Sequence, residues 1–201
     1  MAGRGQEDLH WACQEANLAE VRAALKAVRK GGDSIWAGSR LDGATALHCA
    51  CDPKGAVESR RSAGKAAMQV LQLLLDQPDA DQALNARNLF GDTPLMEAAR
   101  QGVPDPVRLL LEHGAATGEQ NNFGDTALHL ACRLGNAEAA ALLIRHDRGA
   151  AMQLRNKLGA CPSMAPAAAA AALDEGTLED EAPRPPVRAA QGRLSALSVF
   201  L

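Results

Sequence analysis

The feature that most constrains this chain is a short motif that returns along it. Leu-His-x-Ala-Cys occurs at residues 9–13, 47–51 and 128–132, and residues 95–99 keep the same frame. Three of these copies follow a Gly-x-Thr-[Pro/Ala] turn, and a degenerate fifth copy begins at Gly159. Such a unit is too small to form a core alone, so copies that bury their apolar sides against one another predict an elongated stack.

The spacing of the copies shows where extra residues enter. Gly91 and Gly124 are 33 residues apart, whereas Gly43 precedes Gly91 by 48 residues and Gly159 follows Gly124 by 35. Most of the first excess falls in residues 52–67, and the rest in 78–84. We expect these insertions to lie in loops, which would leave the helices in frame.

Each residue of the motif has a mechanical role. The Gly permits the positive φ of a tight turn, and the Thr accepts backbone N–H groups at the start of a helix. Pro94 suits the first helical position, where no N–H is needed. Gly102 and Gly135 end the first helix of their copies, an aliphatic run such as 107–111 forms the second helix, and Gly114 ends it.

This pattern resembles the ankyrin-repeat family, whose period is 33 residues and whose motif is Thr-Pro-Leu-His-x-Ala. The resemblance covers roughly residues 7–173 and implies an all-α solenoid of stacked antiparallel helix pairs with β-turn fingers. It implies about four to five repeats, in a domain at residues 1–173. Their expected bounds are 7–39, 40–87 with an insertion at 52–67, 88–120, 121–155 and a degenerate 156–173.

The resemblance also implies a binding surface, because ankyrin repeats bind proteins on a concave face made of turn tips and first helices. In repeats three and four the matching positions are Arg87, Leu89, Phe90, Asp92, Arg100, Gln101, Gln120, Asn122, Phe123, Asp125, Arg133 and Leu134. In repeat two they are Ser39, Leu41, Asp42, Ala44 and Asp52, and in repeat five Arg155, Lys157 and Leu158.

Phe90 and Phe123 are the first candidates for anchors. They are two of only three phenylalanines and lie at equivalent positions one repeat apart. Two exposed aromatic rings in register could anchor a partner. The alternative is that each ring packs on the adjacent turn and stiffens it. The basic residues of the same surface could favour an acidic segment of a partner, or they are scattered surface charge.

Composition narrows the function. A net charge of −3 gives no global attraction for nucleic acid. No stretch approaches the roughly 18 apolar residues of a membrane span, and residues 1–8 lack the apolar run of a signal peptide. Five cysteines without a secretory signal indicate reduced thiols, and therefore a cytoplasmic or nuclear protein. We expect a monomer.

His10, His48 and His129 share one position of the repeat. The resemblance implies that this histidine forms hydrogen bonds within and between turns. His48 also lies close to Cys49 and Cys51, which raises the alternative of a metal site. Consecutive helical residues point in different directions, however, and no second Cys-x-x-Cys pair is present. The sequence therefore predicts neither a metal site nor a cofactor.

Cys13, Cys51 and Cys132 occupy a small position of the repeat, which predicts buried core thiols. No serine-hydrolase elbow, phosphate loop, kinase motif set or zinc-protease motif is present. Solenoids also lack the deep cavity that most enzymes use. The sequence therefore predicts a protein that is not an enzyme.

Two segments depart from the repeat. The insertion at 52–67 is basic. Three interpretations are open: a docking loop, a phosphorylation site at Ser59 or Ser62, or a passive disordered insertion. Residues 174–201 begin acidic and proline-rich, and their apolar residues then recur at helical spacing. We expect a linker and a short terminal helix that caps the last repeat or binds a partner.

The sequence thus predicts an adaptor that binds one protein partner. One alternative is a regulatory subunit or inhibitor of an enzyme or transcription factor, which would change the activity of its partner and not only its location. Another is a fragment of a larger multidomain protein. The sequence does not identify the partner, because ankyrin surfaces have no transferable recognition code.

Overall fold

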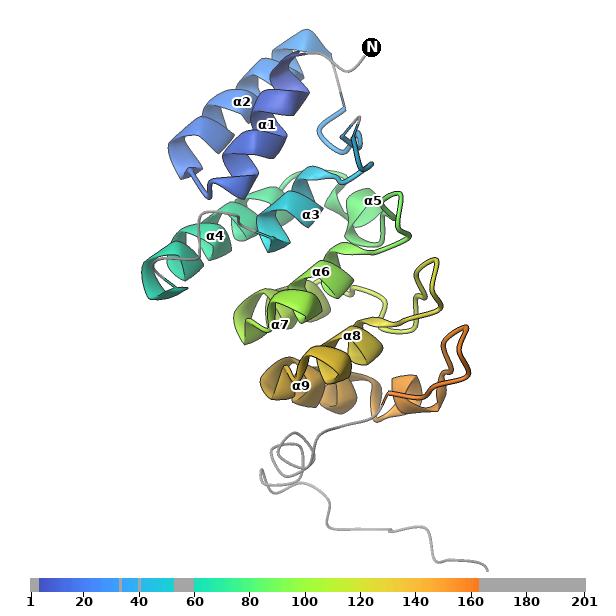
Figure 1. Cartoon of the computed structure of the whole chain (residues 1–201). Helices are drawn as coiled ribbons and strands as arrows, with labels where there is room; N and C mark the ends of the chain where they lie inside the picture. The colour runs from blue at the N-terminus through green and yellow to red at the C-terminus, as the bar shows by residue number, and fades with distance from the viewer. Residues whose placement is uncertain (1–3, 33, 40, 53–59, 163–201) are drawn as a thin grey trace, which may run out of the picture.

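The computed structural model describes residues 4–32, 34–39, 41–52 and 60–162. Within them the chain folds into nine α-helices and no β-strand. The helices stack in chain order into an elongated solenoid, with loops projecting from one side as fingers (Figure 1). This architecture confirms the predicted all-α solenoid. The helices are α1 (Arg4–Gln14), α2 (Leu18–Gly31), α3 (Ala46–Cys51), α4 (Arg60–Leu75), α5 (Ala80–Leu84), α6 (Pro94–Gln101), α7 (Pro104–Glu112), α8 (Ala127–Leu134) and α9 (Ala137–Asp147).

The helices form two layers that run along the stack. The first helices of the repeats, α1, α3, α6 and α8, each contact the next in their layer, and the second helices, α2, α4, α7 and α9, do the same behind them. The core follows the repeated motif, because its leucine is buried in every copy. These four leucines are Leu9, Leu47, Leu95 and Leu128.

The predicted helix boundaries hold in repeats three and four. Thr93 and Thr126 lie before α6 and α8, and each hydroxyl oxygen accepts the backbone N–H three residues later. Pro94 takes the first helical position of α6. Gly102 and Gly135 follow these helices with φ angles of +71° and +73°, in the left-handed region that glycine adopts readily.

The insertion at 52–67 differs from the expected loop. Residues 60–67 form the first turns of α4, and Ala67 is buried. Lys65, Ala66 and Ala67 are good helix formers, so this part of the insertion lengthens the helix at its start. The extra residues around 78–84 likewise form the short helix α5. Both insertions therefore add helix where the sequence predicted loop.

Several predictions lie outside the described residues. They concern Ser59, the side chain of Ser62, the end of the degenerate fifth repeat at 163–173, and the tail at 174–201. The fifth repeat is described only through its finger and residues up to 162. None of the described helices is both long and apolar enough to cross a membrane.

Candidate functional site

The fingers are rigid because asparagine side chains close them from within. The Asn88 side-chain oxygen accepts the N–H groups of Phe90 and Asp92, each at 2.9 Å. Asn121 and Asn156 repeat this arrangement in the next two fingers. In each of the three fingers the backbone N–H of the asparagine also donates to the carbonyl four residues later. The finger of repeat two is one residue wider and closes between Ser39 and Ala44.

Backbone hydrogen bonds also join each finger to the next. The N–H of Leu89 donates to the Asp42 carbonyl at 2.8 Å, and the N–H of Asn122 donates to the Phe90 carbonyl at 3.0 Å. Lys157 donates to the Phe123 carbonyl in the same way, at 3.0 Å. The tips of successive fingers are therefore held in register.

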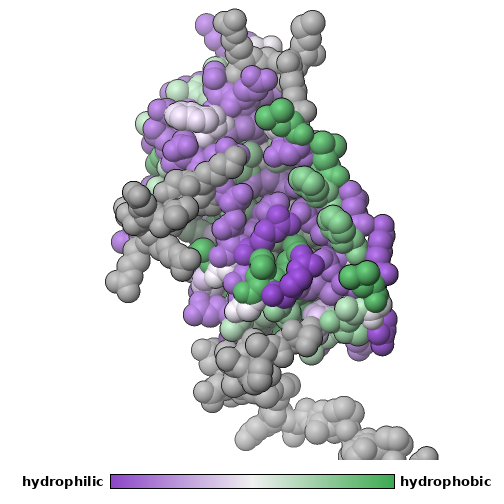
Figure 2. Space-filling model, in the orientation of Figure 1, coloured by the Kyte–Doolittle hydropathy of each residue, from purple (hydrophilic) through white to green (hydrophobic). Residues whose placement is uncertain are grey.

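The finger tips carry a row of exposed apolar side chains, which we call the apolar ridge. Its members are 55–91% exposed, and they are Leu41, Leu89, Phe90, Phe123 and Leu158. In Figure 2 the hydrophobic colour recurs along the side of the molecule on which the fingers project. The predicted anchors Phe90 and Phe123 thus face solvent in register, and a partner contact there stays a prediction.

Asp92 and Asp125 require a correction, because the sequence placed them on the binding surface and the structure buries both at 2% exposure. Asp92 accepts hydrogen bonds from Arg100 and from the Asn121 side chain of the next finger. Asp125 accepts from Arg133 at 2.6 Å and from Asn156 at 2.9 Å. A buried carboxylate is stable only when such partners replace water. These two residues join the fingers to the helices instead of meeting a partner.

The basic residues predicted for this surface are largely engaged. Arg100 pairs with Asp92 and lies 3.4 Å from Glu97, and Arg133 pairs with Asp125. Gln101 donates to the Asp52 carboxylate at 2.6 Å. Leu134, at the end of α8, is 52% exposed. Because the arginines already face carboxylates, the surface is less basic than the sequence suggested.

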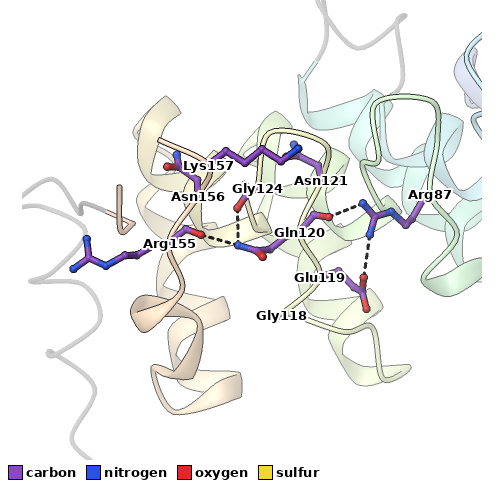
Figure 3. Close-up of a pocket in the computed structure, with 9 residues that line it drawn as sticks. All are labelled: Arg87, Gly118, Glu119, Gln120, Asn121, Gly124, Arg155, Asn156 and Lys157. Carbon is purple, nitrogen blue, oxygen red and sulfur yellow. Dashed lines mark hydrogen bonds and ion pairs between the residues drawn. The ribbon is translucent and has the colours of Figure 1, made fainter. Parts of the chain in front are cut away.

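Beside the fingers of repeats three to five lies an open polar hollow of about 490 Å³ (Figure 3). Arg87 crosses it to donate to the Gln120 carbonyl at 2.6 Å, and it also pairs with Glu119 at 3.5 Å. The Gln120 side chain donates to the carbonyls of Gly124 and Arg155. Arg155 points away from the hollow (Figure 3). Arg87 and Gln120 thus link neighbouring fingers through hydrogen bonds, a role that the sequence did not predict.

The histidines have the structural role that the sequence predicted. The N–H of Thr45 donates to His48 Nδ1 at 3.1 Å, so the ring proton is on Nε2, which donates to the Asp92 carbonyl at 2.9 Å. His129 bonds Thr126 and the Ala160 carbonyl in the same way. Burial lowers the pKa of His48, which keeps the ring neutral.

Glu97 is a feature that the sequence analysis missed. It occupies the variable position of the motif on α6 but is only 9% exposed. Burial, together with Asp92, Asp52 and Asp42, raises the pKa of its carboxyl to about 7, although Arg100 opposes this. The sequence does contain a sign of this site, because Glu97 is the one charged residue among the otherwise apolar residues 95–99.

The five cysteines divide into two groups by burial. Cys13, Cys49 and Cys51 are buried, whereas Cys132 and Cys161 are half-buried. Burial raises the pKa of the Cys13 and Cys51 thiols, which makes them poor nucleophiles. The prediction of buried core thiols is thus confirmed for Cys13 and Cys51 and wrong for Cys132. Among the described residues, no three His, Cys, Asp or Glu side chains gather closely enough to hold a metal ion.

A second hollow, of about 290 Å³, lies between α1 and the finger of repeat two. We call it the first-repeat pocket. Its lining residues are Glu7, His10, Trp11, Gln14, Ser39, Leu41, Asp42 and Cys49. Only Leu41, Asp42 and Ser39 of this set belonged to the surface predicted from the sequence. Repeat one lacks the Gly-x-Thr turn, and no surface positions were predicted for it, so Glu7 and Trp11 were not among the predicted residues.

Helix pairs stacked in register, each led by a hairpin finger, define a solenoid repeat protein with an open ridged face. The family model for ankyrin repeats in three copies matches residues 61–156. These residues are therefore ankyrin repeats, as their motifs predicted. Ankyrin repeats are in general modules of protein–protein interaction and are typically not catalytic. The comparison with curated proteins finds no match to this chain.

Proposed function

We propose that this chain is an adaptor that binds a protein partner across its fingers and first helices, as a monomer in the cytoplasm or nucleus and without catalysing a reaction. The apolar ridge is the observation that carries the proposal. Its five side chains are exposed, yet backbone hydrogen bonds hold their fingers in fixed register. A preordered apolar surface loses little conformational entropy on binding, and such surfaces mark interaction sites. Five cysteines in a chain whose first residues show no secretory signal support a reducing compartment.

The test is affinity purification from cells with quantitative mass spectrometry. We expect the Phe90→Ala/Phe123→Ala double variant to lose at least tenfold of a partner that the wild-type chain enriches, because central aromatic anchors supply much of the binding free energy. The matched control is Val103→Ala/Met152→Ala, which removes two exposed apolar side chains outside the fingers. This control should retain the partner.

Circular dichroism shows first that both variants are folded. Equal recovery of every partner by wild type and by the Phe90→Ala/Phe123→Ala variant would remove the ridge from the proposed surface. A partner lost equally by both double variants would show that the loss does not depend on the fingers.

A further inference from the structure

The polar hollow beside the fingers of repeats three to five contains the side chain of an exposed lysine, Lys157. This side chain extends from the finger of repeat five across the hollow toward Asn121 (Figure 3). Within the described part of the chain, its ammonium group forms no ion pair and no side-chain hydrogen bond. A positive charge is therefore available at this place for a group from outside.

Arg87 enters the hollow from the opposite side (Figure 3). Its guanidinium donates to the Gln120 carbonyl at 2.6 Å, but Nη1 lies 3.5 Å from the Glu119 carboxylate. A strong hydrogen bond between charged groups is about 2.7–2.9 Å long, so this pair is loose. Both side chains are also nearly half exposed, and such pairs contribute little to stability. Another carboxylate could therefore replace Glu119 at Arg87 with little loss.

The charges that face the hollow leave an excess of positive charge. Arg87 and Glu119 offset each other, and Lys157 remains. Arg155 belongs to the lining, but its side chain points away and donates to the Gly159 carbonyl at 2.7 Å (Figure 3). Among the described lining residues, Glu119 is thus the one carboxylate that faces two cations.

Two more carboxylates, Asp92 and Asp125, lie behind the lining. They accept hydrogen bonds from Asn121 and Asn156, which line the hollow. Each of these aspartates is buried and already paired with an arginine of a first helix. Their charges are therefore balanced inside the stack, and they do not offset Lys157.

The hollow is continuous with the apolar ridge. Phe123 lies between Asn121 and Gly124, which both line the hollow, and Leu158 directly follows Lys157. The side chains of Phe123 and Leu158 are 63% and 91% exposed. A partner that packs on these two residues therefore brings its neighbouring side chains to the hollow.

Building on the proposed adaptor function, we propose that the hollow receives the side-chain carboxylate of an aspartate or glutamate of the protein partner. The carboxylate would lie between the Lys157 ammonium and the Arg87 guanidinium, in the place of Glu119. Apolar residues beside it in the partner would pack on Phe123 and Leu158. Complementary charge contributes to specificity more than to affinity, so the hollow would select among the partners that the ridge can hold.

The test begins with a library of random dodecapeptides displayed on phage and selected on the immobilised full-length chain. We expect the selected peptides to share an aspartate or glutamate beside apolar residues. The best peptide is then synthesised with a fluorescein label, and its Kd is measured by fluorescence anisotropy. Lys157→Met keeps most of the stem and removes the charge, and it should weaken binding about tenfold. Glu119→Gln removes the competing carboxylate and should strengthen binding about threefold.

The matched control is Lys26→Met, which removes the same charge from the exposed face of α2, outside the lining. It should change the Kd less than twofold, which separates the hollow from a general effect of net charge. Replacing the shared acidic residue of the peptide by its amide should weaken binding to the wild type about tenfold. It should add little in Lys157→Met, because the two partners of one contact are not additive.

The inference is overturned if the library yields no binder, if the selected peptides share no acidic residue, or if Lys157→Met leaves the Kd unchanged. Peptides without an acidic requirement that lose affinity in Phe90→Ala/Phe123→Ala would remove the hollow and leave the adaptor function standing. Binders indifferent to both sets of variants would count against both.

The chain itself also contains carboxylates that could compete, at positions outside the described residues. The full-length variant Glu179→Gln/Asp180→Asn/Glu181→Gln tests them, and we expect it to bind the peptide as the wild type does. Tenfold tighter binding by this variant would identify the chain's own acidic segment as the occupant and overturn the assignment to a partner.

Discussion

At the scale of single residues, Gly91 and Gly124 satisfy two requirements at once. Their φ angles are +78° and +80°, a conformation that costs other L-residues about 1–2 kcal/mol. A Cβ atom at Gly91 would also lie 2.8 Å from the backbone nitrogen of Asn122, and one at Gly124 only 2.6 Å from that of Lys157. The opposing atoms are backbone atoms of the next finger, so they cannot move without breaking the ladder between fingers.

We therefore expect Gly124→Ala to lower the free energy of unfolding by about 3 kcal/mol, the sum of backbone strain and overpacking. Gly114→Ala is the matched control, because Gly114 has a φ of +85° but nothing within 4 Å of its Cβ position. It should cost only about 1 kcal/mol. Urea denaturation measures both, and equal losses would mean that finger packing contributes nothing.

Glu97 gives a prediction that depends on pH. Its pKa is about 7 in the folded chain against an ordinary 4.5, so the folded state binds the proton more tightly than the unfolded state. The ionised carboxyl is therefore disfavoured by folding, and stability is lost as the pH rises from 4.5 through 7. Glu97→Gln, which mimics the neutral acid, should be more stable than wild type by about 2 kcal/mol at pH 8.

The advantage of Glu97→Gln should disappear below about pH 3.5, where wild-type Glu97 is protonated in both states. Chemical denaturation at both values of pH measures this difference, and other titrating groups cancel between the two proteins. Glu112→Gln, an exposed carboxyl on α7, is the control and should change stability less. An advantage of the same size at both pH values would contradict the assignment.

The sequence could predict residues whose role is local. The turn glycines, the capping threonines and Pro94 act within a few residues of themselves, so the motif alone indicates what they do. Asp92 and Asp125 could not be placed in this way, because their burial depends on an asparagine of the following finger. The raised pKa of Glu97 likewise comes from burial and from carboxylates on other elements.

At the scale of elements, the loop that follows α8 also binds the neighbouring repeat. The Asn136 side chain, between α8 and α9, donates to the carbonyls of Ala99 and Arg100 at 2.8 and 2.9 Å. These carbonyls lie at the end of α6, where no helical N–H is available to them. Asn136 thus caps a helix of the preceding repeat and fixes the distance between the two pairs.

We expect Asn136→Ala to lower the free energy of unfolding by about 2 kcal/mol, because two half-buried carbonyls lose their donor. Asn122→Ala provides the comparison. Its side chain also donates to a carbonyl of the preceding repeat, that of Leu89, but it is exposed and water can replace it. Asn122→Ala should cost less than about 0.5 kcal/mol. Thermal unfolding of both variants measures these losses of stability. A larger loss in Asn122→Ala than in Asn136→Ala would contradict the prediction.

Helices that follow the motif could be predicted with their boundaries, as α6 and α8 show. The start of α4 and the whole of α5 could not, because both lie in insertions where the period is interrupted. The local preference of residues such as Lys65, Ala66 and Ala67 for helix extends α4 there. The extra residue in the finger of repeat two could not be predicted either. Its turn keeps the expected Gly-x-Thr, so the motif gives no sign that the finger is one residue longer.

At the scale of the whole molecule, periodicity determines the shape and leaves the chemistry of the surface open. The motif leucines are buried in every repeat, so the stack itself followed from the sequence. The charge of its open face did not, because it depends on which carboxylates each arginine meets in the folded chain. Arg100 is paired with Asp92 and Arg133 with Asp125. These arginines, which could have favoured an acidic partner, are therefore already engaged.

The stack also predicts how the molecule unfolds. Each helix pair contacts only its neighbours along the layers, so a weakened end repeat should unfold before the rest. The two tryptophans of the chain, Trp11 and Trp36, both lie at the N-terminal end and report on that end alone. Far-UV circular dichroism reports on all the helices. Comparing the two signals therefore distinguishes unfolding of the N-terminal end from unfolding of the other repeats.

Leu143 on α9 is fully buried, and Leu143→Ala should destabilise the last repeat by about 3 kcal/mol. In urea, the circular dichroism of this variant should begin to fall at lower concentration than tryptophan fluorescence changes, because the C-terminal repeats unfold while the N-terminal repeats around Trp11 and Trp36 stay folded. Val21→Ala, a cavity in α2 at the other end, should reverse that order. Coincident transitions in both variants would mean that the repeats unfold as one unit, and that coupling between neighbours exceeds the loss from either cavity.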